Sequence, residues 1–471
     1  MNFRWPASPR RAIAASLLAG LCAAGTVIPC QAATPVGAKR VQQSAGFRSN
    51  SLDGQQLFAL EIQAKQLPAV EGGHDHIVLI DTSASQVAAH RRQGIAVLEA
   101  FFSALPATDR VHLKAVDVAP KALMDGFHPA ASEETQQALA TLKKRVPLGA
   151  TDLEAALQSA LATVPGEQRP ASVVYIGDGM STAGLIGSAE LEQLLQKLRS
   201  SRVPVHSYAV GPRTDLQLLG VLAQRTGGML MFDDADARKD APAAAGSRLA
   251  AAANAPVFYP ETLKYEPAGL EVLPAVALPL RSDRSTVYLA RGLAAESVQL
   301  TLSAQSQSVS ESLPVGRMTA AGPFLQSLWN QAETSDGLTV AYAGRSVLQA
   351  AQRAYESEIV RLEAAGEQAV GIRELDRAEQ IGQAILKLDP ANVRAQAMLG
   401  ASDRVRNRIL AQADAAQPPA AQPPAAQPPA ADNGLQARQE PVDPAEIDLI
   451  QQEQARRRIK LQRLTLEVAD V

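Results

Sequence analysis

Two short apolar runs constrain the fold of this chain more than any other feature. They are Ile77–Ile80 and Ser172–Ile176, and stretches with helical periodicity follow each of them. Strands that are apolar on both faces are expected where helices cover both faces of a parallel sheet. Strand and helix patterns alternate from about 74 to 236, so we predict an α/β domain with a doubly wound, mostly parallel sheet.

The remaining elements of this domain follow from the same periodicities. The predicted helices cover 86–105, 133–144, 152–164, 189–200 and 215–225, and the further strands cover 111–118, 203–210 and 229–232. A length of roughly 160 residues suits one domain. Because the chain has 471 residues, further domains are expected on either side.

The segments that flank the α/β domain have strand patterns. Residues 33–73 are polar except for Gln56–Ala64, which predicts one strand, and the alanine-rich residues 241–255 predict a flexible or helical connection. Residues 256–316 predict a small β-rich domain. Its strand-like runs are 270–277, 286–289 and 298–302. We expect the strand at Gln56–Ala64 to pair with that domain, because the chain enters and leaves the α/β domain at neighbouring ends.

The C-terminal part divides into three regions. Residues 344–412 have a helical pattern, and the segment around Pro390 resembles the turn of a tetratricopeptide unit. Only one unit is visible and such repeats need about three, so an ordinary helical hairpin is favoured. Residues 413–443 contain repeated Gln-Pro-Pro-Ala-Ala and predict an extended linker. Residues 444–471 predict a basic helix that is either solvated or docked on a partner or a membrane surface.

The first 32 residues predict an export signal. Arginines precede an apolar run at 12–27, and Ala32 ends a pattern that a signal peptidase recognises. We expect cleavage near Ala32 and a periplasmic or secreted protein. Both cysteines, Cys22 and Cys30, lie in this segment, so the mature chain would have no disulfide and no cysteine nucleophile. The net charge of −3 argues against nucleic acid as a partner.

The polar stretch after the first apolar run has the chemistry of a metal site. Asp81, Ser83 and Ser85 alternate in sequence, so an extended backbone directs their side chains to the same side. Ligand sets made only of oxygen atoms suit a hard divalent cation such as Mg²⁺.

These residues resemble the first motif of the metal-ion-dependent adhesion site (MIDAS) of von Willebrand factor A (vWA) domains. Thr151 in the loop before a predicted helix and Asp178 after the second apolar run are similar to the other two motifs. The resemblance implies a Rossmann-like fold and one ion, Mg²⁺ or else Mn²⁺ or Ca²⁺, held by Asp81, Ser83, Ser85, Thr151 and Asp178. It implies a non-enzymatic protein that binds an exposed Asp or Glu of a partner protein. The layout of the whole chain looks like that of uncharacterised secreted bacterial vWA proteins.

Other functions remain open at this point. The chain could be a metal-independent assembly scaffold that acts through its helical region and tail. Gly177-Asp178-Gly179-Met180-Ser181 also resembles a metal-binding stretch of alkaline phosphatases, but the six histidines form no cluster downstream of it. His74-Asp75-His76 is either a small metal site or a polar pair at the start of a strand.

Overall fold

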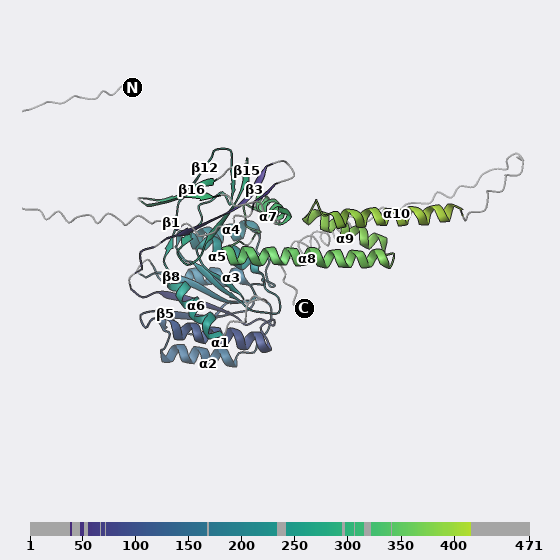
Figure 1. Cartoon of the computed structure of the whole chain (residues 1–471). Coiled ribbons are helices and arrows are strands. Elements are labelled where there is room, and N and C mark those ends of the chain that lie inside the picture. Colours follow the sequence, from purple (N-terminus) through teal and green to yellow (C-terminus); the bar gives the residue numbers. More distant parts are fainter. Residues whose placement is uncertain are drawn as a thin grey trace, which may run out of the picture. The chain divides into compact units, whose positions relative to one another are not determined.

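The computed structural model describes most of the chain between residues 38 and 415 (Figure 1). The described residues are 38–39, 48–50, 55–65, 67–70, 72–166, 169–232, 242–293, 297–305, 307–314, 322–340 and 342–415. The predicted signal at 1–32, the predicted helix at 444–471 and the linker beyond residue 415 lie outside them. None of the helices within the described residues has the length and apolar character needed to span a bilayer.

A seven-stranded sheet forms the centre of the α/β domain (Figure 1). Its strands are β4 (Asp75–Asp81), β5 (Arg110–Val116), β6 (Lys121–Ala122), β7 (His128–Pro129), β8 (Ala171–Gly177), β9 (Val205–Ala209) and β10 (Leu230–Phe232). The order is β10-β9-β8-β4-β5-β6, and β7 also pairs with β5. Only β6 and β7 pair antiparallel, which confirms the prediction of a mostly parallel sheet.

Helices cover both faces of this sheet. They are α1 (Ala88–Ala104), α2 (Glu133–Lys144), α3 (Leu153–Thr163), α4 (Ser188–Ser200), α5 (Leu216–Thr226) and α6 (Pro242–Asn254). Apolar side chains of α3, α4 and α5 pack on the face that carries Ile77 and Leu79 of β4. Those of α1, α2 and α6 pack on the opposite face, with Val78 and Ile80. The apolar residues of β4 thus contribute to two cores, one on each face of the sheet.

Two larger sheets and a pair of short strands form the β-rich domain. The larger sheet contains β1 (Ala38–Lys39), β2 (Arg48–Asn50), β3 (Gln56–Ala64), β13 (Glu271–Leu273) and β15 (Thr286–Gly292). The smaller contains β12 (Thr262–Glu266), β16 (Ser297–Ala304) and β17 (Gln307–Pro314), while β11 (Val257–Phe258) pairs with β14 (Leu280–Arg281). Side chains of both sheets share one core. The strand β3 has the predicted bounds and pairs antiparallel with β15, as expected.

Two predictions for this part of the chain were wrong in detail. Residues 33–73 contribute three strands instead of one. The strand expected at 270–277 ends at Leu273, because Pro274 has no N–H to donate to a neighbouring strand. Of the two alternatives left open for the alanine-rich residues 241–255, flexible or helical, the helix is found: it is α6, whose Ala245, Leu249 and Ala253 are buried in the core beside α1.

The last described part is helical. It contains α7 (Gly322–Ser335), which was not predicted, and then α8 (Arg345–Gly371), α9 (Leu375–Leu388) and α10 (Val393–Ala415). Trp329 of α7 packs with Leu57 and Val287 of the larger β-sheet. The favoured hairpin around Pro390 is formed by α9 and α10, and α8 packs on it, so that side chains of the three helices share a small core.

Candidate metal centre

The five predicted site residues lie at one edge of the α/β sheet. Asp81 is the last residue of β4, and Asp178 directly follows β8, its parallel neighbour in the sheet. Ser83 and Ser85 lie in the loop between β4 and α1, and Thr151 precedes α3. The carboxyl ends of parallel strands and the loops after them form the usual ligand crevice of open α/β sheets.

Hydrogen bonds connect all five residues in one cluster. The Ser83 amide donates to Asp81 Oδ1 at 2.8 Å, and the Thr151 hydroxyl donates to the same carboxylate at 3.2 Å. The hydroxyls of Ser83 and Ser85 are 2.9 Å apart. The Ser85 hydroxyl donates to Asp178 Oδ2 at 2.5 Å. The residues that the sequence predicted as one site are therefore together in space.

Two glycines make room for the carboxylates. A Cβ atom on Gly177 would lie 2.5 Å from the Cβ of Asp81, and one on Gly211 would lie 2.6 Å from the Cβ of Asp178. Non-bonded carbon atoms do not approach that closely, so a side chain at either position would displace a site residue. The lack of a side chain at these two glycines, on β8 and on the loop after β9, therefore allows Asp81 and Asp178 to occupy their positions.

The electrostatics of the cluster are unfavourable without a cation. Asp81 is 4% exposed and Asp178 is 2% exposed. Burial raises the pKa of Asp81, and burial together with the charge of Asp81 raises the pKa of Asp178 to about 6. Neither carboxylate belongs to an ion pair among the described residues. Two buried acids thus share a site that contains hydroxyl donors but no positive charge.

The set of donor atoms fits a hard divalent cation. Two carboxylates and three hydroxyls offer only oxygen, the ligand type of Mg²⁺, Ca²⁺ and Mn²⁺. Within the described part of the chain no three His, Cys, Asp or Glu side chains are grouped so that they could hold a metal. In the candidate centre, serine and threonine hydroxyls would supply three of the five side-chain ligands.

Two further residues position the site and were missed by the sequence analysis. The Tyr175 hydroxyl donates to Asp81 Oδ2 at 3.1 Å and accepts the Gly179 amide at 3.1 Å. Burial raises the pKa of Tyr175, which keeps this hydroxyl protonated. Gln86 donates to the Val210 carbonyl at 3.0 Å and approaches the Ser85 hydroxyl at 3.4 Å. Tyr175 and Gly177 are two residues apart on β8 and therefore lie on the same face of the strand. This alternation is the sequence pattern that could have identified Tyr175.

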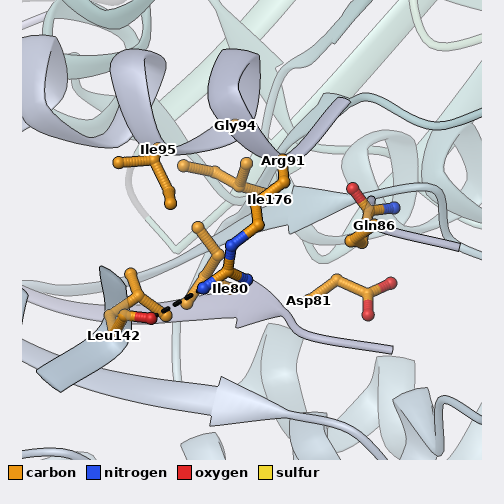
Figure 2. A pocket seen from close by; sticks show the side chains of 8 residues that line it. All are labelled: Ile80, Asp81, Gln86, Arg91, Gly94, Ile95, Leu142 and Ile176. Atoms are coloured by element: carbon orange, nitrogen blue, oxygen red, sulfur yellow. Dashed lines mark hydrogen bonds between the residues drawn. The ribbon is translucent and has the colours of Figure 1, made fainter. Parts of the chain in front are cut away.

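A narrow pocket lies beside the candidate centre, between α1 and the sheet (Figure 2). It is lined by Ile80, Asp81, Gln86, Arg91, Gly94, Ile95, Leu142 and Ile176. Arg91 donates to the Leu142 carbonyl at 2.8 Å and also to the Arg145 carbonyl. Figure 2 shows the Asp81 carboxylate directed away from this guanidinium. The arginine is therefore engaged with backbone carbonyls and does not neutralise the acid.

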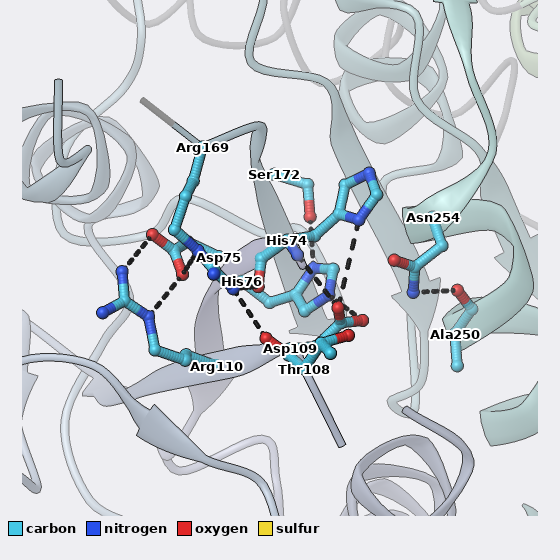
Figure 3. A network of polar contacts seen from close by, with 10 residues as sticks. All are labelled: His74, Asp75, His76, Thr108, Asp109, Arg110, Arg169, Ser172, Ala250 and Asn254. Carbon is cyan, nitrogen blue, oxygen red and sulfur yellow. Dashed lines mark hydrogen bonds and ion pairs between the residues drawn. The ribbon is translucent and has the colours of Figure 1, made fainter. Parts of the chain in front are cut away.

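A second polar network occupies the opposite edge of the sheet (Figure 3). Asp75 is fully buried and accepts Arg110 Nε at 2.8 Å and Arg169 Nε at 3.0 Å. His76 Nδ1 lies 2.8 Å from the Ser172 hydroxyl, and its Nε2 lies 3.3 Å from Asp109. Asp75 thus forms ion pairs with two arginines at the start of β4, and no group of three His, Cys, Asp or Glu side chains that could hold a metal occurs among the described residues.

Comparison with known proteins places this geometry in context. The family model described as von Willebrand factor type A domain matches residues 75–232. No curated protein matches the chain. A solved von Willebrand factor type A structure from Catenulispora acidiphila is similar, with 14% identity and a TM-score of 0.37, over 74% of this chain and 88% of that chain.

Two other solved structures are similar at the same level. VWA2, the ArnB paralog from Sulfolobus acidocaldarius, has 15% identity and a TM-score of 0.36, over 74% of this chain and 88% of that chain. An aerotolerance-related membrane protein from Bacteroides fragilis has 16% identity and a TM-score of 0.32, over 39% of this chain and 99% of that chain. Identities this low concern the fold alone.

Proposed function

Because residues 75–232 form a von Willebrand factor type A domain, we propose that this chain is a non-enzymatic, metal-dependent protein-binding protein. Domains of this family commonly mediate protein–protein interactions. In the proposal, Asp81, Ser83, Ser85, Thr151 and Asp178 hold one divalent cation, Mg²⁺ or else Mn²⁺ or Ca²⁺. The bound cation would supply a Lewis-acidic position for the carboxylate of an Asp or Glu on the partner protein.

The observation that carries the proposal is the buried pair of acids at Asp81 and Asp178. Burying one charged carboxylate without a counter-charge costs several kcal/mol, and a second nearby raises that cost. The hydroxyls of Ser83, Ser85 and Thr151 orient the carboxylates but bring no charge. A divalent cation at this position would balance both acids and use the remaining lone pairs of the hydroxyls.

Binding is favoured over hydrolysis by the side chains around the site. A metal-dependent phosphohydrolase would need a second metal and histidine ligands near Asp178. All six histidines are among the described residues, and none of them hydrogen-bonds to the five site residues. Two of the three site hydroxyls are also buried, since Ser83 is only 3% and Thr151 only 1% exposed, so neither offers a free nucleophile.

We also propose that the chain is exported, with cleavage of its first segment near Ala32. The support is the pattern of arginines followed by an apolar run at 12–27. Such a protein would meet its partners in the periplasm or outside the cell. Mass spectrometry of the mature N-terminus would test this, and a chain that retains residues 1–32 would contradict it.

Calorimetric titration of the full-length chain with Mg²⁺ tests the metal site. We expect one bound ion in the original protein, none in Asp81→Ala, and one in the control Asp125→Ala, because Asp125 is an exposed acid of the same domain. An Asp81→Ala protein that still binds one ion would contradict the assignment.

Capture of partners from the native extract tests the function. We expect partners to be retained with Mg²⁺ and released by a chelator. Retention that persists in Asp81→Ala and in excess chelator would instead favour a metal-independent scaffold. Deleting 444–471 would then show whether the predicted tail helix makes the contact.

A further inference from the structure

Exposed aliphatic side chains gather on the loops around the candidate metal centre. Large hydrophobic side chains are exposed there at Val87 (49%), Val118 (58%), Val146 (68%), Leu148 (68%) and Leu185 (64%). A single exposed aliphatic side chain is normal on any protein surface, whereas several on adjoining loops indicate a contact surface. We call these five residues the apolar rim.

Backbone hydrogen bonds hold the loops of the apolar rim together. The Leu148 amide donates to the Thr82 carbonyl at 3.0 Å, and the Ala84 amide donates to the Gly149 carbonyl at 3.0 Å. These two bonds join the loop that carries Val146 and Leu148 to the loop that carries Ser83, Ser85 and Val87.

The loops of Leu185 and Val118, the other two residues of the apolar rim, also adjoin the candidate centre. The Ala183 amide donates to the Thr151 carbonyl at 2.9 Å, which brings the loop of Leu185 to a site residue. A Cβ atom on Gly149 would lie 3.5 Å from a methyl group of Val118. Four of the aliphatic residues therefore lie on loops that contain a residue of the candidate centre, and Val118 adjoins the loop of Thr151.

A positive charge on a neighbouring loop indicates which kind of ligand the apolar rim would contact. Arg213 is exposed on the loop between β9 and α5. The Asp215 amide of that loop donates to the Asp178 carbonyl at 2.7 Å. A positive side chain on a loop that adjoins the centre favours an anionic group there, while the aliphatic side chains of the other loops favour apolar groups on either side of it.

We propose that the apolar rim binds large apolar side chains that flank the acid of the partner. The ligand is then a protein segment in which one Asp or Glu lies between aliphatic or aromatic residues. This inference rests on the proposed function, because the acid is positioned by the metal. The metal fixes orientation, and burial of the flanking side chains against the rim contributes affinity and selectivity.

Selection from a random-peptide display library tests this surface. The full-length chain is immobilised with Mg²⁺, and bound peptides are eluted with a chelator and sequenced. The original protein is expected to enrich peptides with an acid and with Leu, Ile, Val, Phe or Trp within two positions of it. The double variant Leu148→Ser, Leu185→Ser is expected to keep the acid and lose the apolar flanks.

A matched control and an affinity measurement complete the test. Leu293→Ser removes a leucine that is 82% exposed just after β15, so it is expected to select the same peptides as the original protein. The best peptide should bind the double rim variant about tenfold or more weakly, since each buried leucine contributes more than 1 kcal/mol.

The outcomes separate the two proposals. Chelator-eluted peptides that share an acid but no apolar flank would overturn the rim and leave the metal site intact. Peptides that share no acid and resist the chelator would overturn the proposed function. If the double variant instead turns a dimer of the chain into a monomer without changing peptide selection, the rim is an interface between copies and the inference is wrong.

Discussion

At the scale of residues, Asp81 and Asp178 determine how stability depends on pH when no cation is bound. Burial raises the pKa of both, that of Asp178 to about 6 from a usual value of 3.8. An acid with a raised pKa in the folded state favours folding at low pH. Without metal, stability from this pair is therefore present below about pH 4 and is lost as the pH rises to about 6.

Replacing one acid should stabilise the metal-free protein. We expect Asp178→Asn to raise the free energy of unfolding at pH 7 by on the order of 1–3 kcal/mol without metal, because it removes a buried charge. Mg²⁺ should then add no stability. Urea unfolding with Mg²⁺ and with chelator measures both effects. Asp125→Asn serves as the control, and a less stable metal-free Asp178→Asn would refute this account.

Tyr175 should support the metal site without binding the metal. Tyr175→Phe removes one donor to Asp81 and leaves the Gly179 amide without its acceptor. We expect a loss of about 1–2 kcal/mol of stability and a severalfold weaker affinity for Mg²⁺. Tyr288→Phe is a matched control, because its hydroxyl accepts the Leu278 amide inside the β-rich domain. The control should lose stability and keep its affinity for Mg²⁺.

At the scale of elements, the sequence predicts what depends on local pattern. The site residues can be placed together because Asp81 and Asp178 each end a strand with apolar residues on both faces. The ends of neighbouring parallel strands must meet at one edge. Tyr175 is harder to assign, because a tyrosine within an apolar strand has the pattern of a core residue. Only the packing against Asp81 reveals its contact with the site.

Where the sequence pattern of an element is weak, packing against neighbouring elements determines its secondary structure. In β17, Val309 and Leu313 are buried and serines lie between them, so the sequence pattern of this strand is weak. Its antiparallel pairing with β16 is what defines it as a strand. The alanines of α6 suit a linker as well as a helix. The close approach of α6 to α1 decides between them, since the helix buries its alanine face there.

The close contact between α1 and α6 predicts an effect of added volume. A Cβ atom on Gly246 would lie 2.6 Å from the backbone nitrogen of Phe101, so the two helices would have to separate. We expect Gly246→Ala to lower the free energy of unfolding by about 1–3 kcal/mol. Gly400→Ala in α10 meets only the end of Arg404, and should stabilise by up to about 1 kcal/mol. Thermal unfolding distinguishes them, and equal effects would refute the packing argument.

At the scale of the whole molecule, buried histidines set the response to acid. Burial lowers the pKa of His74, His112 and His206 from a usual value of 6.5, most strongly for His206, which is fully buried. A base with a lowered pKa in the folded state takes up protons on unfolding. Stability from these residues is therefore complete above about pH 6.5 and is lost as the pH falls below it.

The metal-loaded protein should thus be less stable at pH 5.5 than at pH 7.5. We expect His206→Phe to reduce this difference, because it removes the histidine with the most strongly lowered pKa while keeping a ring in the core. Urea unfolding at both pH values with saturating Mg²⁺ measures the change. A difference that is the same in the variant would show that His206 does not contribute to it.

The pairing of β3 with β15 has a consequence for the integrity of the chain. These strands lie on either side of the vWA domain in sequence, so the backbone crosses between the two domains twice. One crossing lies between Ala64 and Asp75, and the other between Asn254, the end of α6, and Val257. A single proteolytic nick at either crossing leaves the domains covalently tethered by the other. A pulling force on the vWA domain, such as a partner bound at the proposed site would exert, would likewise be divided between two chain connections instead of one.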